Sequence, residues 1–243
     1  MGHEWIDAEK EFKWSEDVKV ESEVTEIVLV RHGETTWNAA RRIQGQIESE
    51  LNEVGQKQAV AIAESDTRSS VFIRPVAVYS SDLKRAKDTA LMIAKTCFCP
   101  EVTEVPDLKE RHVGSLQGLY WTEGAEKEPE AYSAFFSSQN DLEIPLRPAS
   151  TSFDQLCDRS MNALEKIAKK HKGKRVIVVT HGGVLRAIYL RITQASSAGK
   201  LLNASVNVVH LRHKKWIIDS WSDVSRLSSV GFLQRGFDGD AKP

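Results

Sequence analysis

Short apolar segments recur along the chain, and each has the length of a buried β-strand. Residues 27–30 and 175–180 are the clearest, because nearly every position is apolar, as expected of a strand covered on both faces. The last two segments flank a turn at 212–214 and predict a hairpin. The predicted strands are residues 27–30, 76–79, 101–105, 175–180, 205–211 and 215–220.

Apolar residues at helical spacing occupy much of the chain between these strands. The longest predicted helix begins with the capping-box pair Ser152 and Gln155 and ends before Gly173, and Asn52 can cap another. The predicted helices are residues 52–65, 82–96, 129–137, 153–171 and 183–192. Because strands alternate with helices, the sequence predicts an α/β three-layer sandwich with a mostly parallel central sheet.

No shift in composition divides the 243 residues, so we expect one domain over residues 25–243. Residues 1–24 are polar and acidic and are predicted to form an extension of that domain. This segment has neither the apolar core of a secretory signal nor the arginine-rich composition of a transit peptide. Residues 66–75 are predicted to be a loop, and the tail after Val224 is predicted to be irregular.

The composition excludes several classes of function. A net charge of −1 offers no general attraction for nucleic acid, and no apolar stretch approaches the about 20 residues of a membrane span. Cys97, Cys99 and Cys157 are an odd number of cysteines, which favours free thiols in a reducing compartment. We therefore expect a cytoplasmic protein with no nucleic-acid or membrane partner.

Two predicted strands end in a histidine followed by glycine. Ligands of open α/β sheets bind beyond the carboxyl ends of the strands, so His32 and His181 are expected at one site. Arg31 precedes the first histidine, and Arg85 follows the end of another strand. Two arginines and two histidines without an acidic cluster predict a phosphate pocket.

Such a pocket suits phosphoryl transfer without a metal ion or other cofactor. The reaction needs a nucleophile, cations for the phosphoryl oxygens and an acid for the leaving oxygen. An unprotonated histidine can serve as the nucleophile, and Glu110 is the candidate acid. No cluster of carboxylates or paired ligands marks a metal site.

Four motifs together resemble the signature of the histidine phosphatase superfamily, also called the phosphoglycerate mutase-like family. They occur in the family's order over residues 25 to about 220. The motifs are Arg31-His32-Gly33-Glu34-Thr35 with Trp37-Asn38, Ser80-Ser81-Asp82-Leu83-x-Arg85-Ala86, Leu108-x-Glu110-Arg111 and Thr180-His181-Gly182-Gly183. The resemblance implies the phosphoglycerate mutase-like fold and a phosphomonoesterase that acts on a small phosphorylated metabolite.

The resemblance also implies roles for individual residues. His32 would be the nucleophile that becomes phosphohistidine, and Glu110 would be the proton donor. The residues implied to hold the phosphate are Arg31, Asn38, Arg85, His181 and Gly182. The end regions are similar to those of plant phosphoglycerate mutase-like proteins, a group in which some members are metal-independent phosphoserine phosphatases, so phosphoserine is one candidate substrate.

A cofactor-dependent mutase is the first alternative. Mutases of this family carry a longer insert before the last histidine motif and tend to have tyrosine and lysine where Val113 and Trp121 stand. A weakly active phosphoester-binding protein is the second, because Glu48 replaces a common aspartate and residues 66–74 and 146–152 depart from the family pattern.

Several polar residues have less specific expectations. Arg111 and His112 flank the candidate acid and could bind the rest of the substrate, such as its carboxylate. His210 and His213 lie on the predicted hairpin and are expected to be solvated rather than ligands. An exposed strand of that hairpin could pair with a partner, and a homodimer is one possibility.

Overall fold

The computed structural model describes residues 23–64, 75–99, 101–137, 144 and 151–232. Most of the predicted extension at 1–24 lies outside these residues. So do the loop 66–74, most of the segment 146–152 and the end of the irregular tail. Among the helices of the described residues, none combines the length and the apolar composition that a membrane span requires.

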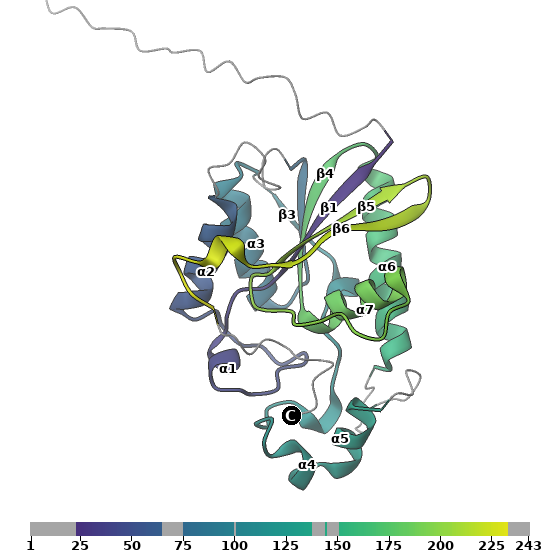
Figure 1. The fold of residues 1–243 in the computed structure, drawn as a ribbon. Helices are drawn as coiled ribbons and strands as arrows, with labels where there is room; N and C mark the ends of the chain where they lie inside the picture. Colours follow the sequence, from purple (N-terminus) through teal and green to yellow (C-terminus); the bar gives the residue numbers. More distant parts are fainter. Residues whose placement is uncertain (1–22, 65–74, 100, 138–143, 145–150, 233–243) are drawn as a thin grey trace, which may run out of the picture.

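The centre of the fold is a six-stranded sheet in the order β3-β2-β4-β1-β5-β6 (Figure 1). The first four strands in this order are parallel, and β5 and β6 are antiparallel to their neighbours. The prediction of a mostly parallel sheet is therefore confirmed. The strands are β1 (Thr25–Arg31), β2 (Ala77–Ser80), β3 (Val102–Glu104), β4 (Arg175–Thr180), β5 (Val206–Arg212) and β6 (Lys215–Asp223).

Helices cover both faces of the sheet and complete the three layers (Figure 1). One face packs against α2 (Glu53–Ala63), α3 (Lys84–Thr96) and the 3₁₀ turn η3 (Ser225–Leu227). The other packs against α6 (Phe153–Lys170) and α7 (Gly182–Thr193).

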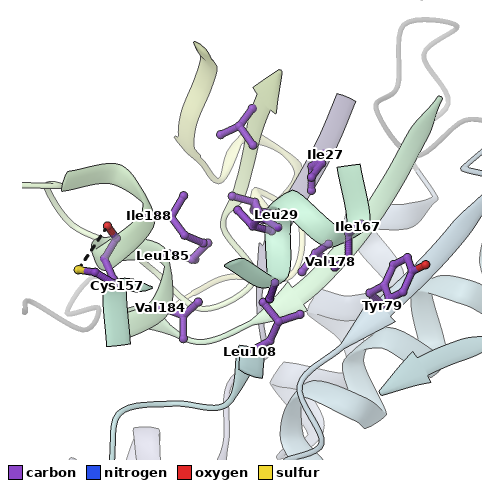
Figure 2. Close-up of a cluster of buried hydrophobic side chains, with 14 of the residues drawn as sticks. Ile27, Leu29, Tyr79, Leu108, Cys157, Ile167, Val178, Val184, Leu185 and Ile188 are labelled. Atoms are coloured by element: carbon purple, nitrogen blue, oxygen red, sulfur yellow. Dashed lines mark hydrogen bonds between the residues drawn. The ribbon is translucent and has the colours of Figure 1, made fainter. Parts of the chain in front are cut away.

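Alternate residues of the central strands fill these two cores. In β1, Ile27 and Leu29 point to the α6–α7 side, whereas Val28 and Val30 point to the α2–α3 side. Figure 2 shows the core on the α6–α7 side, in which Leu185 and other residues of α7 pack near Leu29. Full burial of each such side chain contributes about 1.5–3 kcal/mol. The continuous apolar runs seen in the sequence are thus strands with two buried faces.

Shorter elements lie beyond the carboxyl ends of the parallel strands (Figure 1). They are α1 (Thr36–Ala39), η1 (Pro106–Leu108), η2 (Gly114–Leu116), α4 (Gly124–Lys127) and α5 (Pro129–Phe135). A small apolar cluster beside η2 and α5 includes Ile43, Leu116 and Ile144. This cluster fixes the chain next to the strand ends without extending the main core.

The structure corrects a few element boundaries. The helix expected from residue 82 begins at Lys84, because the preceding residues take other partners: Asp82 pairs with Lys109 at 2.9 Å, and the Ser81 hydroxyl accepts from the N–H of Leu83. The short helices α1 and α4 were not predicted, because four residues are too few to show a helical period.

Candidate active site

Two histidines lie side by side because their strands are neighbours in the sheet. Arg31 at the end of β1 is paired with Thr180 at the end of β4, so both strands end at the same level. The N–H of His32 donates to the Thr180 carbonyl at 2.9 Å, and the ring centroids of His32 and His181 are 5.2 Å apart. Both histidines are buried. The prediction that they share one place is confirmed.

His32 is held as a neutral base with one nitrogen left to react. Its Nδ1 lies 2.8 Å from the carbonyl oxygen of Gly33, and because a carbonyl only accepts, Nδ1 carries the hydrogen and Nε2 the lone pair. Burial, and then the charges of Arg85 and Arg31, lower the pKa of His32 well below its usual value. The ring is therefore unprotonated at neutral pH, as a nucleophile must be.

His181 presents a polar atom that has no protein partner. Its Nε2 lies 2.8 Å from the hydroxyl of Ser81, while its Nδ1 is buried without a hydrogen bond. The Ser81 hydroxyl accepts from the N–H of Leu83 and can donate its own hydrogen to Nε2 of His181. Nδ1 then carries the ring hydrogen and can donate it to an anion. Burial, followed by Arg85 and His32, lowers the pKa of His181.

Two arginines bring positive charge to these rings. The Nη atoms of Arg85 donate to the carbonyl oxygens of Gly45 at 2.7 Å and Ile47 at 3.0 Å, while its Nε is buried without a partner. Burial lowers the pKa of Arg85 to about 10, which leaves it charged at neutral pH. Arg31 is also buried and donates to the carbonyl of Leu201. Both guanidinium groups are therefore held by backbone oxygens.

Asn38 is turned so that its amide nitrogen remains available. Its Oδ1 accepts from the N–H and hydroxyl of Thr35 and from Nδ2 of Asn203 at 3.1 Å. The same Nδ2 of Asn203 lies within 3.1 Å and 3.3 Å of the carbonyls of His32 and Gly33. Asn203 thus connects the orientation of Asn38 with the backbone at the candidate nucleophile.

The side chain of Glu110 contacts the N-terminal end of α7, which begins directly after His181. One carboxylate oxygen accepts from the N–H of Arg111 at 2.7 Å and the other from the N–H of Gly183 at 3.0 Å. A Cβ at position 183 would lie 2.3 Å from this carboxylate, so only glycine leaves room for it. Gly182 offers the N–H of the first helical residue, and helix N-termini favour anions.

The loop after His32 packs on α2 through two glycines. A Cβ on Gly33 would lie 2.5 Å from the carbonyl oxygen of Gly55, and a Cβ on Gly55 would lie 2.1 Å from that of Glu34. Since both obstacles are backbone atoms, neither can move aside. This contact holds the loop that follows His32 against α2.

The remaining predicted residues lie elsewhere in the site's surroundings. Arg111 donates through Nε to the Thr151 carbonyl at 2.9 Å and lies over the rings of Phe135 and Phe153. The His112 ring lies 3.2 Å from the N–H of Gly114 and 3.2 Å from the side-chain nitrogen of Gln117. These contacts fix the segment that follows Glu110, and a role toward substrate stays a prediction.

Four supporting residues were missed by sequence reasoning. Ser81 and Asn203 orient His181 and Asn38, Gly45 has a φ of +54° that directs its carbonyl to Arg85, and the side chain of Gln46 donates to the Glu110 carbonyl at 2.9 Å. Ser81 and Gly45 stood inside or beside the motifs. Asn203 carried no signal beyond its place before a strand.

The site can therefore hold a phosphate group between neutral histidines and buried arginines. Hydrogen-bond donors stand on His181, Asn38 and Gly182, and the lone pair of His32 Nε2 is available to the phosphorus. Within the described ranges, no group of three or more histidine, cysteine or acidic residues could hold a metal ion.

Comparisons with known proteins match this chain over most of its length. A sequence model of the histidine phosphatase superfamily (branch 1) matches residues 27–224. The chain is 89% identical over all 243 residues, and over 100% of both chains, to a metal-independent phosphoserine phosphatase of Arabidopsis thaliana. It is 49% identical to phosphoglycerate mutase-like protein 4 of the same plant, over 93% of this chain and 95% of that one.

A solved structure adds a match in three dimensions. The phosphoserine phosphatase of Entamoeba histolytica, crystallised with 3-phosphoglyceric acid, superposes with a TM-score of 0.70 and is 26% identical. The match covers 84% of this chain and 99% of that one.

Proposed function

Because this chain belongs to the histidine phosphatase superfamily and is a phosphoric monoester hydrolase, we propose that it hydrolyses phosphoserine by way of a phosphohistidine on His32. The observation that carries the proposal is the neutral His32, whose Nδ1 hydrogen is used by the Gly33 carbonyl and whose ring lies beside that of His181. Phosphoserine is the substrate in the names of the 89% identical relative and of the Entamoeba structure.

The first step forms a bond between Nε2 of His32 and phosphorus and breaks the bond between phosphorus and the serine oxygen. Arg31, Arg85 and His181 stabilise the charge on the three remaining phosphoryl oxygens, with Asn38 and the N–H of Gly182 as further donors. Because Arg31, Arg85 and Asn38 are already held by hydrogen bonds within the protein, their charges and dipoles are oriented before the substrate binds.

Glu110 acts as the general acid in the first step and as the general base in the second. In the first it gives its proton to the departing serine oxygen, which would otherwise leave as an alkoxide. In the second step the carboxylate takes a proton from water, the water oxygen attacks phosphorus, and inorganic phosphate and neutral His32 are released.

Positive charge comes from arginine rather than from a metal ion in this proposal. Guanidinium groups match phosphate oxygens, and Arg85, with a pKa of about 10, keeps its charge at neutral pH. The relative's name includes metal independence. We further propose that the enzyme works in the cytosol, where Cys97, Cys99 and Cys157 stay reduced.

The test is rapid quenching of the enzyme with phosphoserine labelled in its phosphate. A labelled protein adduct is expected that is labile in acid and stable in base, as a phosphoramidate is. His32→Ala should abolish both adduct and turnover, whereas His213→Ala, on an exposed turn, should retain both. The initial rate should also survive extensive treatment with a chelator.

Two results would count against the proposal. An acid-stable adduct, or labelling that persists in His32→Ala, would remove the phosphohistidine. Interconversion of phosphoglycerates faster than phosphate release from phosphoserine would identify a mutase instead.

A further inference from the structure

We propose that two copies of this chain form a symmetric dimer by antiparallel pairing of their β6 strands, with the two-fold axis at Ile217. β6 is the last strand of the sheet order, so one of its edges has no neighbouring strand in the described part of the chain. Unpaired edges of this length are templates for pairing with another strand.

The hairpin turn determines which backbone groups of β6 point outward. Arg212 pairs with Lys215 across the two residues His213 and Lys214, both with positive φ, which is a two-residue hairpin of the primed type. In such a hairpin the flanking pair exchanges both of its hydrogen bonds, and the pattern alternates thereafter. The backbone groups of Trp216 and Ile218 therefore face the free edge.

This alternation limits how two edges can be matched. The outward-facing residues 216 and 218 must hydrogen-bond to outward-facing residues of the other copy, which are also even-numbered. When even-numbered residues pair with even-numbered residues, the two-fold axis passes through a residue and not between two residues. The pairing with β5 shifts register at Asp219, so the regular edge runs from Lys215 to Ile218 and Asp219 stands at its end.

With the axis at Ile217, the exposed side chains of the two edges match each other in charge and in apolar contact. Lys215 then lies opposite Asp219 of the second copy, twice by symmetry, and the two Ile217 side chains meet at the centre. Ile217 is 47% exposed, and the pairing would remove part of this apolar surface from water. A lysine on an edge strand normally opposes pairing, but here each lysine meets an aspartate.

Neighbouring registers lack this match. An axis at Ile218 would place Ile217 opposite Asp219, and an axis at Asp219 would bring two aspartates together. The other face of the strand favours no further register, because Trp216 and Ile218 pack toward α6 and α7. The geometry thus points to one register, in which the interface is isologous.

Cross-linking of the full chain tests the register. In the proposed dimer residue 217 forms a non-hydrogen-bonded pair with itself, with Cα atoms about 4.5 Å apart, which a disulfide can bridge. Ile217→Cys should therefore give a covalent dimer on mild oxidation. The matched control is Leu91→Cys, also 47% exposed but on α3, which should give no more than the native thiols do.

Charge reversal tests the interface without a new thiol. Lys215→Asp should raise the dimer dissociation constant by about tenfold or more, since two attractive pairs become repulsive. Adding Asp219→Lys to that variant should restore the constant. Sedimentation equilibrium of the wild-type chain and both variants provides the comparison.

Three outcomes would overturn the proposal. A wild-type chain that stays monomeric at all accessible concentrations would leave the edge to be covered by another segment or another protein. A dimer that ignores the charge reversal, or one in which Ile217→Cys cross-links no better than Leu91→Cys, would use a different surface.

Discussion

The carboxylate of Glu110 is held by two backbone donors, and this determines where a proton can be delivered. Glu110→Gln should slow the release of an alkyl leaving group by about 10²- to 10⁴-fold, because glutamine has no acidic proton. A nitrophenyl phosphate should lose much less in the first step, since nitrophenolate leaves without help. The measurement is kcat/KM against the pKa of the leaving group.

The same variant should also slow hydrolysis of the phosphoenzyme. A burst of nitrophenolate followed by slow turnover is therefore expected. A loss that is equal for all leaving groups would indicate a displaced loop instead, and no loss would move the acid to another residue, with Glu34 the next to test.

Asn203 is predicted to act as a positioning residue, because its amide holds Asn38 and the carbonyl of His32. Asn203→Ala should weaken inhibition by inorganic phosphate by about tenfold, through loss of one oriented donor. Asn162→Ala, on the exposed side of α6, is the control. Equal phosphate affinity in both variants would show that Asn203 only supports the fold.

At this scale the sequence predicted the residues that carry charge or a reactive nitrogen. His32, His181, Arg31 and Arg85 were predictable because strand ends converge at one edge of a parallel sheet. Asn203 was not, since its role depends on a turn that meets β1 from far along the chain. His210 was expected to be solvated and is half-buried against Glu26, because the sequence does not reveal which residue lies opposite it in the sheet.

Among the elements, α3 has a cap that comes from another part of the chain. Its N-cap residue Leu83 has no side-chain acceptor, and the N–H of Lys84 donates to the carboxylate of Glu48 at 3.0 Å. Glu48 belongs to the loop whose carbonyls hold Arg85, so the cap joins that loop to its helix. The glutamate that departs from the family pattern thus has a structural use here.

Glu48→Ala should lower the free energy of unfolding by about 1 kcal/mol, the usual effect of a lost cap. For a chain of this size that corresponds to a fall of about 2–4 °C in Tm, which calorimetry can measure. Glu50→Ala removes a nearby exposed carboxylate 4.0 Å from Lys84 and should change Tm little. Equal effects of the two substitutions would contradict the cap.

Element prediction succeeded where a period extended over several turns or a strand was apolar throughout. The helix predicted over 153–171 is α6, with its capping box formed between Ser152 and Gln155. The hairpin was predicted from its two apolar segments and is β5–β6. The order of the strands was not predictable, because pairing depends on contacts between distant segments.

For the whole molecule, a partly buried ion cluster links three neighbouring strands. Glu26 of β1 lies 3.2 Å from Nε2 of His210 on β5 and also pairs with Arg175 on β4. Burial alone raises the pKa of Glu26, but the hydrogen bonds from His210 and Arg175 outweigh it, so that the pKa is lowered. The bond to Glu26 raises the pKa of His210, against the opposite effect of burial.

This cluster predicts how stability changes with pH. A raised folded-state pKa means that the contribution of His210 is fully present below about pH 6.5 and is lost as pH rises through the raised value. Between about pH 6 and pH 8, the Tm of His210→Gln should therefore fall less than the Tm of the wild type. His213→Gln, on the exposed turn, should follow the wild type. Parallel profiles for all three would disprove the linkage.

The contact between Gly33 and Gly55 has a consequence for the variation open to this chain. Every other amino acid adds a Cβ, and at either position that atom meets the backbone of the other segment. A second substitution cannot compensate, because neither glycine has a side chain left to shorten. We therefore expect glycine to be retained at both positions under random drift and directed evolution alike, while the surrounding loop stays free to change.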